Sequence, residues 1–436
     1  MRKSNTNPVL YLYLVYFIYF FCGMAQCFES VFPNEFIEYF HLTNTQWAYT
    51  SLAKNSAFLL LSIPVGFIAS KIGYRKCLTI AMLLYAAGTF FIIPALHHGW
   101  YWLILTAFFI VGAGFNFQLV VGNPLLSLLG KPEGSASRLN LGNALGAVAW
   151  IIAPLLITVL VPVSITRASE KIPYMIGIFT AIAVILVVTV AATFFVRDIS
   201  QSQDKKDKPN TEKRPAVPLW KNLKVLFGFV AIFLVLGTEG GVFSFYQVYL
   251  KSMTATLTDL QKSTFTFYTG IQLTQNQLLF TIFFSLYAMG RLLGSVIQRK
   301  VKPALTLAGA LLASLVILVL VVFVTKGIAG IVLLTFLGLF ISILFPTLYA
   351  MAIEGLGNDT AKASGILTMG FLGGTVIPLV QGKLADLFSV GFSFITAIMA
   401  YAIVILYILY YLRISRNKAK PVKLNNQTNQ LTNLHT

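Results

Sequence analysis

The chain has 436 residues, of which 57% are hydrophobic and only 11% are charged, and its formal net charge is +18. A soluble protein of this length would carry far more polar surface, so the composition excludes a water-soluble fold and is typical of a bundle of membrane helices. The basic residues lie mostly in loops between apolar runs, where they set orientation, so we expect no nucleic-acid partner.

Apolar runs follow one another along the chain, and each is long enough to cross a bilayer as a helix. The first run, after Met1-Arg2-Lys3, is too long for a signal peptide and is not followed by a small-residue cleavage site. We therefore predict twelve spans at residues 8–32, 46–70, 76–96, 100–129, 138–162, 173–196, 223–250, 274–298, 303–324, 328–353, 361–384 and 390–413.

A charged, proline-containing stretch separates the first six runs from the last six. It includes Asp204-Lys205-Lys206-Asp207-Lys208-Pro209 and is typical of a flexible linker. The predicted organisation is an N-terminal six-helix bundle at 1–196, a cytoplasmic linker at 197–222, a C-terminal six-helix bundle at 223–413 and a disordered cytoplasmic tail at 414–436.

The distribution of Lys and Arg predicts the orientation. All but seven of the 32 basic residues lie in the leader, the linker, the tail, or the loops and helix ends on the same side. This bias places both termini in the cytoplasm. Lys54 lies inside a predicted span. The other six exceptions lie in loops or at a helix end on the opposite side, and they are Arg167, Lys171, Lys251, Lys262, Lys326 and Lys383.

An internal repeat supports the division into two halves. Gly66 and Arg75-Lys76 recur 224 residues later as Gly290 and Arg299-Lys300. At the same offset, Gly146 and Pro154-Leu155 recur as Gly370 and Pro378-Leu379. Transporters are often built from such repeats, with the substrate site between them near the middle of the membrane.

One of these segments resembles a known signature. The sequence Gly66-Phe-Ile-Ala-Ser70-Lys-Ile-Gly73-Tyr-Arg75-Lys76 is similar to the loop between helices 2 and 3 of the major facilitator superfamily. That signature has an acid at the position of Ser70, and the acid helps to latch the two halves in one state. The change to Ser70 implies that this chain lacks the usual latch.

Four further segments resemble a narrower group, the fucose–glucose/galactose–proton symporter family. They lie in predicted helices 4–5, 7, 8 and 10–11, and read Gly122-Asn123-Pro124 through Arg138-Leu139-Asn140, Gly237-Thr238-Glu239, Gly290-Arg291, and Phe345-Pro346-Thr347 through Asn358-Asp359-Thr360. The resemblance implies an all-α major facilitator fold with twelve transmembrane helices in two pseudo-repeats. It also implies proton-coupled uptake of a small sugar, fucose-like or a hexose, by alternating access in a bacterial inner membrane.

Only two acids, Glu29 and Glu239, lie well inside predicted spans. An ionisable side chain is costly in a membrane, so each is a candidate functional group; the alternative is a neutral or paired acid that holds helices together. Glu29 stands four residues before Pro33, and in the resembling family an aspartate at the same place relative to a proline is the proton-coupling group. We therefore expect Glu29 to carry the proton, with H⁺ as coupling ion and no cofactor.

Predicted helix 4 departs from the family, and predicted helix 2 carries an unusual charge, Lys54. The family's helix 4 has Glu or Gln four residues before the Asn-Pro pair, where this chain has Leu119; Gln118 is one position earlier, and Asn116 is an alternative. Lys54 has three interpretations: it pairs with Glu29, it faces a cavity and binds an anionic substrate group, or it extends to the membrane surface.

Amide side chains, which both donate and accept hydrogen bonds, suit a polyhydroxylated ligand. Aromatic side chains such as Tyr246, Phe243, Phe245 and Trp150 could stack on the apolar face of a sugar. Asn123 either serves the site or satisfies a carbonyl left free by Pro124. The predicted substrate-binding residues are Gln26, Lys54, Asn116, Gln118, Asn140, Asn143, Glu239 and Gln247, and the predicted conformational or gating residues are Gly66, Gly73, Arg75, Lys76, Arg138, Gly290 and Arg291.

Other classes of function find little support. The sequence has no Walker A motif, GxSxG elbow or HExxH motif, and its Cys and His lack metal-ligand spacing, so we expect neither an enzyme nor a metal site. The alternatives that stay open are a transporter of another solute, such as an anionic metabolite, and a non-transporting sensor with a transporter fold. Substrate and lipid are the expected partners of a monomer.

Overall fold

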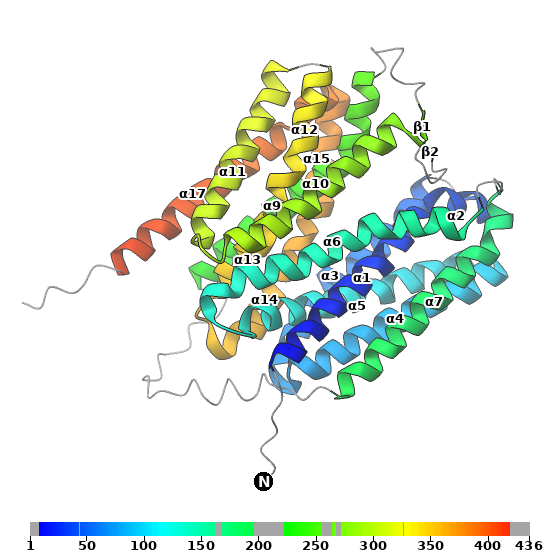
Figure 1. Ribbon diagram of the computed structural model, residues 1–436, viewed down its shortest axis with the longest axis horizontal. Coiled ribbons are helices and arrows are strands. Elements are labelled where there is room, and N and C mark those ends of the chain that lie inside the picture. Colours follow the sequence, from blue (N-terminus) through cyan, green and yellow to red (C-terminus); the bar gives the residue numbers. More distant parts are fainter. Residues whose placement is uncertain are drawn as a thin grey trace, which may run out of the picture.

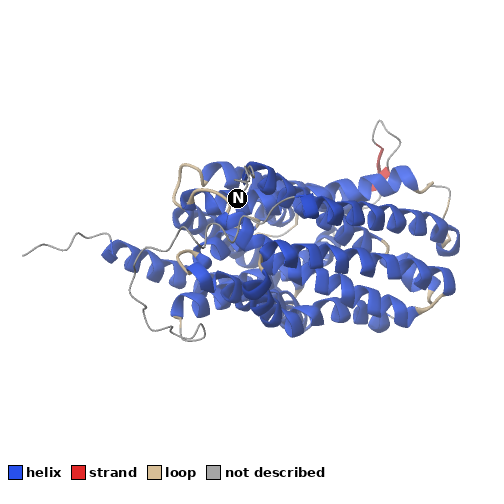
Figure 2. Ribbon diagram, turned by 90° about the horizontal axis from the view of Figure 1, so that it is seen from below, coloured by secondary structure: helices blue, strands red, loops and turns tan. Residues whose placement is uncertain are grey.

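The computed structural model describes residues 8–42, 44–162, 165, 167–195, 222–254, 264–266, 272–325 and 327–418, and almost all of them are helical (Figures 1 and 2). The first half contains α1 (Pro8–Val31), α2 (Pro33–Tyr39), α3 (Asn44–Ile72), α4 (Tyr74–His98), α5 (Tyr101–Leu128), the 3-10 turn η1 (Pro132–Gly134), α6 (Ser135–Leu160) and α7 (Ala168–Phe195).

The second half begins after the predicted linker, of which residues 197–221 lie outside the described residues, as does the tail from residue 419. It contains α9 (Leu223–Thr254), β1 (Thr264–Thr266), β2 (Gln272–Thr274), α10 (Gln275–Ile297), α11 (Pro303–Val319), the π-turn η3 (Leu320–Val324), α12 (Ile328–Ile341), α13 (Leu344–Ile353), η4 (Gly357–Asp359), α14 (Thr360–Thr368), η5 (Met369–Leu372), α15 (Gly373–Leu387), α16 (Val390–Ser393) and α17 (Ile395–Lys418).

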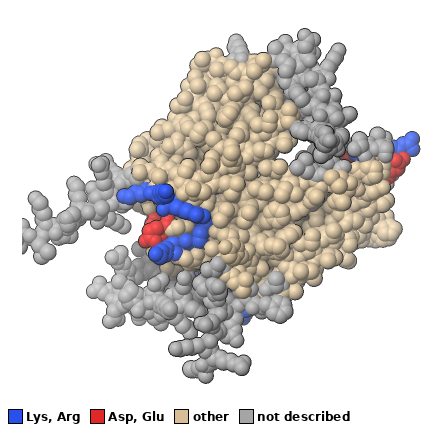
Figure 3. All heavy atoms as spheres, viewed as in Figure 1, with Lys and Arg blue, Asp and Glu red and all other residues tan. Residues whose placement is uncertain are grey.

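The twelve predicted spans are confirmed as helical segments. Ten segments of the described chain are long and apolar enough to cross a membrane. The other two predicted spans correspond to α1, with its apolar stretch Leu10–Gln26, and to α6. The surface agrees with membrane-spanning helices. On the face shown in Figure 3, Lys, Arg, Asp and Glu gather near two ends of the molecule and leave an uncharged band between them.

Four predicted spans are divided rather than continuous α-helices. The run 303–324 forms α11 and η3, and the run 390–413 lies in α16 and α17. The run 328–353 forms α12 and α13, and the run 361–384 forms α14, η5 and α15. Pro346 lacks the N–H that would bond the carbonyl of Ser342 four residues earlier, which accounts for the break between α12 and α13 at residues 342–343. The antiparallel pair β1–β2 was not predicted, because the sequence suggested only a loop there.

The helices form two bundles, each with its own packing. In the first half, α1 packs on α6, and α5 packs on α3 and α4. In the second half, α9 packs on α15, and α12 packs on α10 and α11. The start of α1 and the end of α17 lie on the side where the chain leaves α7 and enters α9, which we call the linker side (Figure 1). The opposite side carries β1 and β2 and is called the hairpin side.

The internal repeat corresponds to repeated packing. Gly23 of α1 lies so close to Gly146 of α6 that a Cβ on Gly23 would be 2.6 Å from the Gly146 carbonyl oxygen. In the second half, a Cβ on Gly370 of η5 would lie 2.6 Å from the side chain of Ile232 in α9. The same pair of helices in each half therefore approaches closely through the glycines that the repeat relates.

The two halves meet through α3 with α14 and through α6 with α10. Near the linker side, the Ser137 hydroxyl donates to the Ser295 carbonyl at 2.6 Å, and the Ser364 hydroxyl donates to the Val120 carbonyl at 2.6 Å. Pro124 accounts for the second bond, because it cannot donate to the Val120 carbonyl. These contacts close the linker side, while the halves diverge toward the hairpin side (Figure 1).

Candidate functional site

A cavity of about 170 Å³ lies between the two halves. Residues of α1, α5 and α6 form one wall, and residues of α9, α10, α13 and η5 form the other. Most of its lining is apolar, with a few polar groups, as is usual for small-molecule sites. The polar side chains that line it are Tyr19, Gln26, Gln118, Asn143, Glu239, Tyr287 and Arg291.

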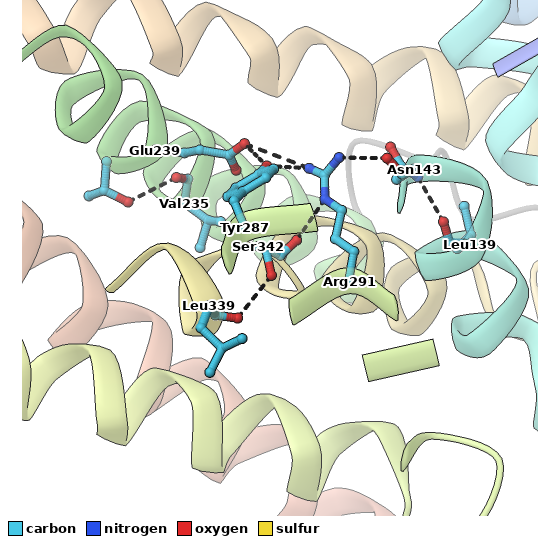
Figure 4. Close-up of polar contacts among 9 residues, drawn as sticks. Leu139, Asn143, Val235, Glu239, Tyr287, Arg291, Leu339 and Ser342 are labelled. Carbon is cyan, nitrogen blue, oxygen red and sulfur yellow. Dashed lines mark hydrogen bonds and ion pairs between the residues drawn. The ribbon is translucent and has the colours of Figure 1, made fainter. Parts of the chain in front are cut away.

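An ion pair of the second half lies in this cavity. Arg291 Nη2 of α10 is 3.7 Å from Glu239 Oε1 of α9, and the side chains are 11% and 10% exposed. Tyr287, one turn before Arg291 on α10, donates its hydroxyl hydrogen to Glu239 Oε1 and accepts a hydrogen bond from Arg291 Nη2 (Figure 4). The three side chains form one network in which the two charges neutralise each other.

The break between α12 and α13 helps to hold Arg291. Its Nε donates to the carbonyl of Ser342 at 3.0 Å. In an unbroken helix that carbonyl would accept from the backbone four residues later, but Pro346 occupies that position and has no N–H. Pro346 thus leaves the Ser342 carbonyl free to accept a hydrogen bond from the guanidinium group of Arg291.

Arg291 also reaches across to the first half. Its Nη1 donates to the backbone carbonyl of Asn143 in α6 at 3.0 Å (Figure 4). The side-chain amide of Asn143 donates to the Leu139 carbonyl of its own helix at 2.9 Å. The ion pair is therefore tied to both halves of the molecule, and a relative movement of the halves must break or stretch this bond.

Aromatic rings form the apolar wall. Trp150 of α6 and Phe284 of α10 are nearly parallel, with ring centroids 6.3 Å apart and planes at 16°. Trp150 and Phe284 lie two turns from Asn143 and Arg291 on the same helices, toward the hairpin side. Phe243 lines the cavity as well, whereas Tyr246 is buried elsewhere and shares a 2.6 Å hydrogen bond with Thr335.

The predicted substrate-binding residues divide into three groups. Gln26, Gln118, Asn143 and Glu239 line the cavity, and Gln26 donates to the Tyr85 hydroxyl at 3.0 Å. Gln118 reaches the cavity from an uninterrupted α5, although it stands one position before the place that the family uses. Arg291, which we predicted as a gating residue, lines the cavity too.

A second group lies away from the cavity. Asn116 donates to the Ser62 hydroxyl at 2.5 Å, and Asn140 donates to Gln298 Oε1 at 2.8 Å in the linker-side contact between the halves. Lys54 is not among the lining residues, and its backbone carbonyl packs against Gly112 of α5.

The third group cannot be placed at the level of side chains. Glu29 and Gln247 lie within α1 and α9, but their side chains are outside the part of the chain that the structure describes. The pairing of Glu29 with Lys54 therefore stays one of the three predicted interpretations of Lys54.

Several predicted gating residues contact other elements closely. A Cβ on Gly66 would lie 2.8 Å from the Ala361 carbonyl of the other half, and one on Gly290 would lie 2.0 Å from the Leu339 carbonyl. Gly73 has φ 88° before α4, a conformation that favours glycine.

Unlike Arg291, the predicted basic gating residues of the first half do not join the halves through the bonds described. Arg75 Nε donates to the Thr193 carbonyl at 2.9 Å, and Arg138 donates to the Leu126 and Ser127 carbonyls at 2.7 and 2.6 Å, all within the first half. Lys76 is exposed. Ser70, at the position of the usual acid, donates to the Phe67 carbonyl of its own helix at 2.7 Å.

Some members of the site were missed. Tyr287, Tyr19 and Phe284 line the cavity, but none stands out in a sequence with 19 Tyr and 36 Phe. The spacing of Tyr287 one turn before Arg291 was the available signal. Asn123 does not satisfy the carbonyl left free by Pro124; it accepts a hydrogen bond from the Tyr19 hydroxyl at 2.7 Å, and Ser364 bonds that carbonyl instead.

Relatives of known name match almost the whole chain. A glucose/galactose transporter of Brucella abortus biovar 1 (strain 9-941) is 29% identical over 406 residues, covering 93% of this chain and 95% of the relative. An L-fucose-proton symporter of Escherichia coli (strain K12) is 23% identical over 397 residues, covering 85% of each chain. These similarities confirm the resemblance drawn from the sequence motifs.

The fold is also that of a solved transporter. A crystal structure of FucP in the outward conformation superposes with a TM-score of 0.79 at 20% identity, covering 92% of this chain and 99% of FucP. The family model described as Major Facilitator Superfamily matches residues 12–269 and 252–434. Together, these matches span both six-helix halves, and the chain belongs to the Major Facilitator Superfamily.

Proposed function

We propose that this chain is a secondary active transporter that moves a small neutral sugar together with a proton by alternating access. The observation that carries the proposal is the cavity between the halves, because polar groups and aromatic rings from both halves line it. Amides and a carboxylate can bond hydroxyl groups, and Trp150 can stack on the apolar face of a sugar ring. The printed names of the relatives, glucose/galactose transporter and L-fucose-proton symporter, support the same class of substrate.

The charges of the cavity favour a neutral solute over an anionic one. Arg291, the cationic side chain among the lining residues, is neutralised by Glu239, and Lys54 does not line the cavity. An anionic metabolite would have to displace Glu239 from Arg291 at a desolvated site, which costs free energy. We therefore place the neutral sugar first and the anionic solute second.

Alternating access requires the linker-side contacts to open when the hairpin side closes. The described conformation has the linker side closed, and its likeness to FucP in the outward conformation supports an outward-facing state. We propose that both termini lie in the cytoplasm of a bacterial cell, that the protein acts as a monomer in the inner membrane, and that Glu29 carries the proton. Protonation removes a charge from α1 and thereby lowers the cost of rearranging the halves.

The test is uptake of labelled fucose, galactose, glucose, a hexuronate and an amino acid into proteoliposomes, with and without an inward proton gradient. We expect the gradient to drive accumulation of a neutral sugar in the wild type. Glu29→Gln is expected to abolish accumulation while sugar exchange continues, because exchange needs no net proton movement.

Four results would contradict parts of the proposal. Uptake of the hexuronate alone would favour the anionic solute. Sugar uptake that does not depend on the proton gradient would contradict proton coupling. Accumulation that is unchanged by Glu29→Gln would contradict the role of Glu29 as the proton carrier. Binding of sugar with no flux in any liposome would favour a sensor with a transporter fold.

A further inference from the structure

Glu239 has one carboxylate oxygen committed to the protein and one that is not. Oε1 accepts the Tyr287 hydroxyl and faces Arg291, whereas Oε2 is buried and has no hydrogen-bond partner among the described residues. A buried carboxylate oxygen without a donor is costly, so such an atom indicates a missing donor. Glu239 lines the cavity, so a ligand there can supply that donor.

The surrounding network fixes the direction of this carboxylate. Arg291 donates to the Tyr287 hydroxyl, and that hydroxyl donates in turn to Glu239 Oε1. Arg291 is itself held by the Ser342 and Asn143 carbonyls, both at 3.0 Å. With Arg291 beside it, Glu239 is compensated in its ionised form, and an ionised carboxylate only accepts hydrogen bonds.

A second acceptor lies on the opposite wall. Gln118 Oε1 of α5 is buried and also has no partner within the described residues. Gln118 and Glu239 belong to different halves, and both residues line the same cavity. A ligand that bears hydroxyl hydrogens on two sides would satisfy both and would tie the halves together.

We propose that Glu239 Oε2 is a specificity-determining acceptor that takes a hydrogen bond from one hydroxyl group of the transported sugar, with Tyr287 and Arg291 as positioning residues and Gln118 accepting from a second hydroxyl. This inference rests on the proposed function and refines it. The carboxylate selects ligands that donate at that position and repels ligands that carry a negative charge there. Bonds to an ionised acceptor are stronger than bonds between neutral groups.

The test uses the full chain in lipid nanodiscs and competition against labelled galactose, or against fucose or glucose if the transport assay selects one of these. Each ring hydroxyl of the sugar is replaced in turn by hydrogen and by fluorine. Neither replacement can donate, so both versions at one carbon should weaken binding to the wild type by about tenfold to a hundredfold.

The variant Glu239→Gln then identifies the partner of that hydroxyl. It should weaken binding of the unmodified sugar by a similar factor, and the analogue that was weak in the wild type should lose little further affinity. Gln118→Leu should remove the sensitivity to a different hydroxyl. The matched control is Glu133→Gln, the same chemical change at an exposed position in η1 outside the cavity lining, which should leave the pattern of the wild type unchanged.

Three outcomes would overturn the inference while leaving the proposed function intact. One is a wild type that binds sugar but loses less than about threefold for every fluorinated analogue, which needs no folded variant to interpret. Another is a hydroxyl penalty that persists in full in Glu239→Gln. The third is a sodium-dependent affinity that Glu239→Gln abolishes without any dependence on a hydroxyl, which would assign Oε2 to a cation. Failure of every neutral sugar to bind or move would instead remove the proposed function.

Discussion

At the scale of residues, the cavity is organised by charge compensation. Arg291 and Glu239 are almost fully buried, and each makes the burial of the other tolerable. The guanidinium group adds bonds to Tyr287, Ser342 and Asn143, so its five donors are used in several directions at once. A lysine could not reproduce this arrangement, because its single ammonium group cannot bond acceptors on three helices in a planar fork.

Removing one partner of this ion pair should lower the free energy of unfolding more than removing both partners. Arg291→Gln leaves the Glu239 carboxylate buried without its countercharge, and we expect a loss of about 3 to 5 kcal/mol in the free energy of unfolding. The double variant Arg291→Gln/Glu239→Gln should recover most of that loss. Thermal unfolding of the purified variants in detergent, arranged as a double-mutant cycle, measures the coupling. A double variant whose destabilisation equals the sum of the two single variants would show that the pair contributes no coupling.

At the scale of elements, glycines of α3 and α14 make a close approach between the halves on the linker side. A Cβ on Gly365 would lie 2.4 Å from the Ser62 carbonyl and 3.3 Å from the Cα of Gly66. Small residues at such a contact let two helices pack tightly, and in a transporter the same contact can separate without breaking interlocked side chains.

A larger side chain at Gly365 should therefore disfavour the conformation described. We expect Gly365→Val to push α3 and α14 apart on the linker side and to shift the population toward the state closed on the hairpin side, with uptake reduced at least tenfold. Spin labels at the exposed Val159 of α6 and Val248 of α9 should report a shorter distance in this variant.

The matched control is Gly177→Val. A Cβ at Gly177 of α7 would meet nothing within 4 Å of the described atoms, so this change should leave both the distance and the uptake unchanged. An unchanged distance in Gly365→Val would show that the glycine contact does not decide between the two states.

At the scale of the whole molecule, transport requires the two bundles to move against each other as units. The contacts that now join them on the linker side include Ser137 with Ser295, whose hydroxyl oxygens are 3.2 Å apart, and Asn140 with Gln298. These are a few hydrogen bonds across an interface, and they can exchange for bonds to water when that side opens.

A covalent bond at the same place should stop the cycle. In a background without the natural cysteines, the double variant Ser137→Cys/Ser295→Cys is expected to form a disulfide on mild oxidation, to lose uptake, and to regain it on reduction. Binding of sugar from the hairpin side should persist, because that side stays open. Either single variant serves as the control, and full uptake by the oxidised double variant would contradict an opening on the linker side.

The sequence by itself determined the architecture. Apolar runs predicted the twelve helices, because a run of that length satisfies its own backbone hydrogen bonds in a bilayer by forming a helix. The repeat of Gly66 and Gly146 at Gly290 and Gly370 indicated the two halves. It also identified Glu239 as a candidate, since an acid within a span is rare enough to be seen. The break between α12 and α13 was not foreseen, although Pro346 could have indicated it.

Only the tertiary structure decided which polar side chains meet. Lys54, Asn116 and Asn140 were predicted to bind substrate, as were Gln118 and Asn143, but these three lie outside the cavity lining. Arg291, predicted as a gating residue, lies in it. The physical reason is that a membrane helix is apolar toward lipid as well as toward its neighbours, so hydropathy does not reveal its rotation. Tyr287 could not be identified from the sequence for the same reason. Its hydroxyl bonds both Glu239 and Arg291, and the packing of α9 on α10 fixes that position.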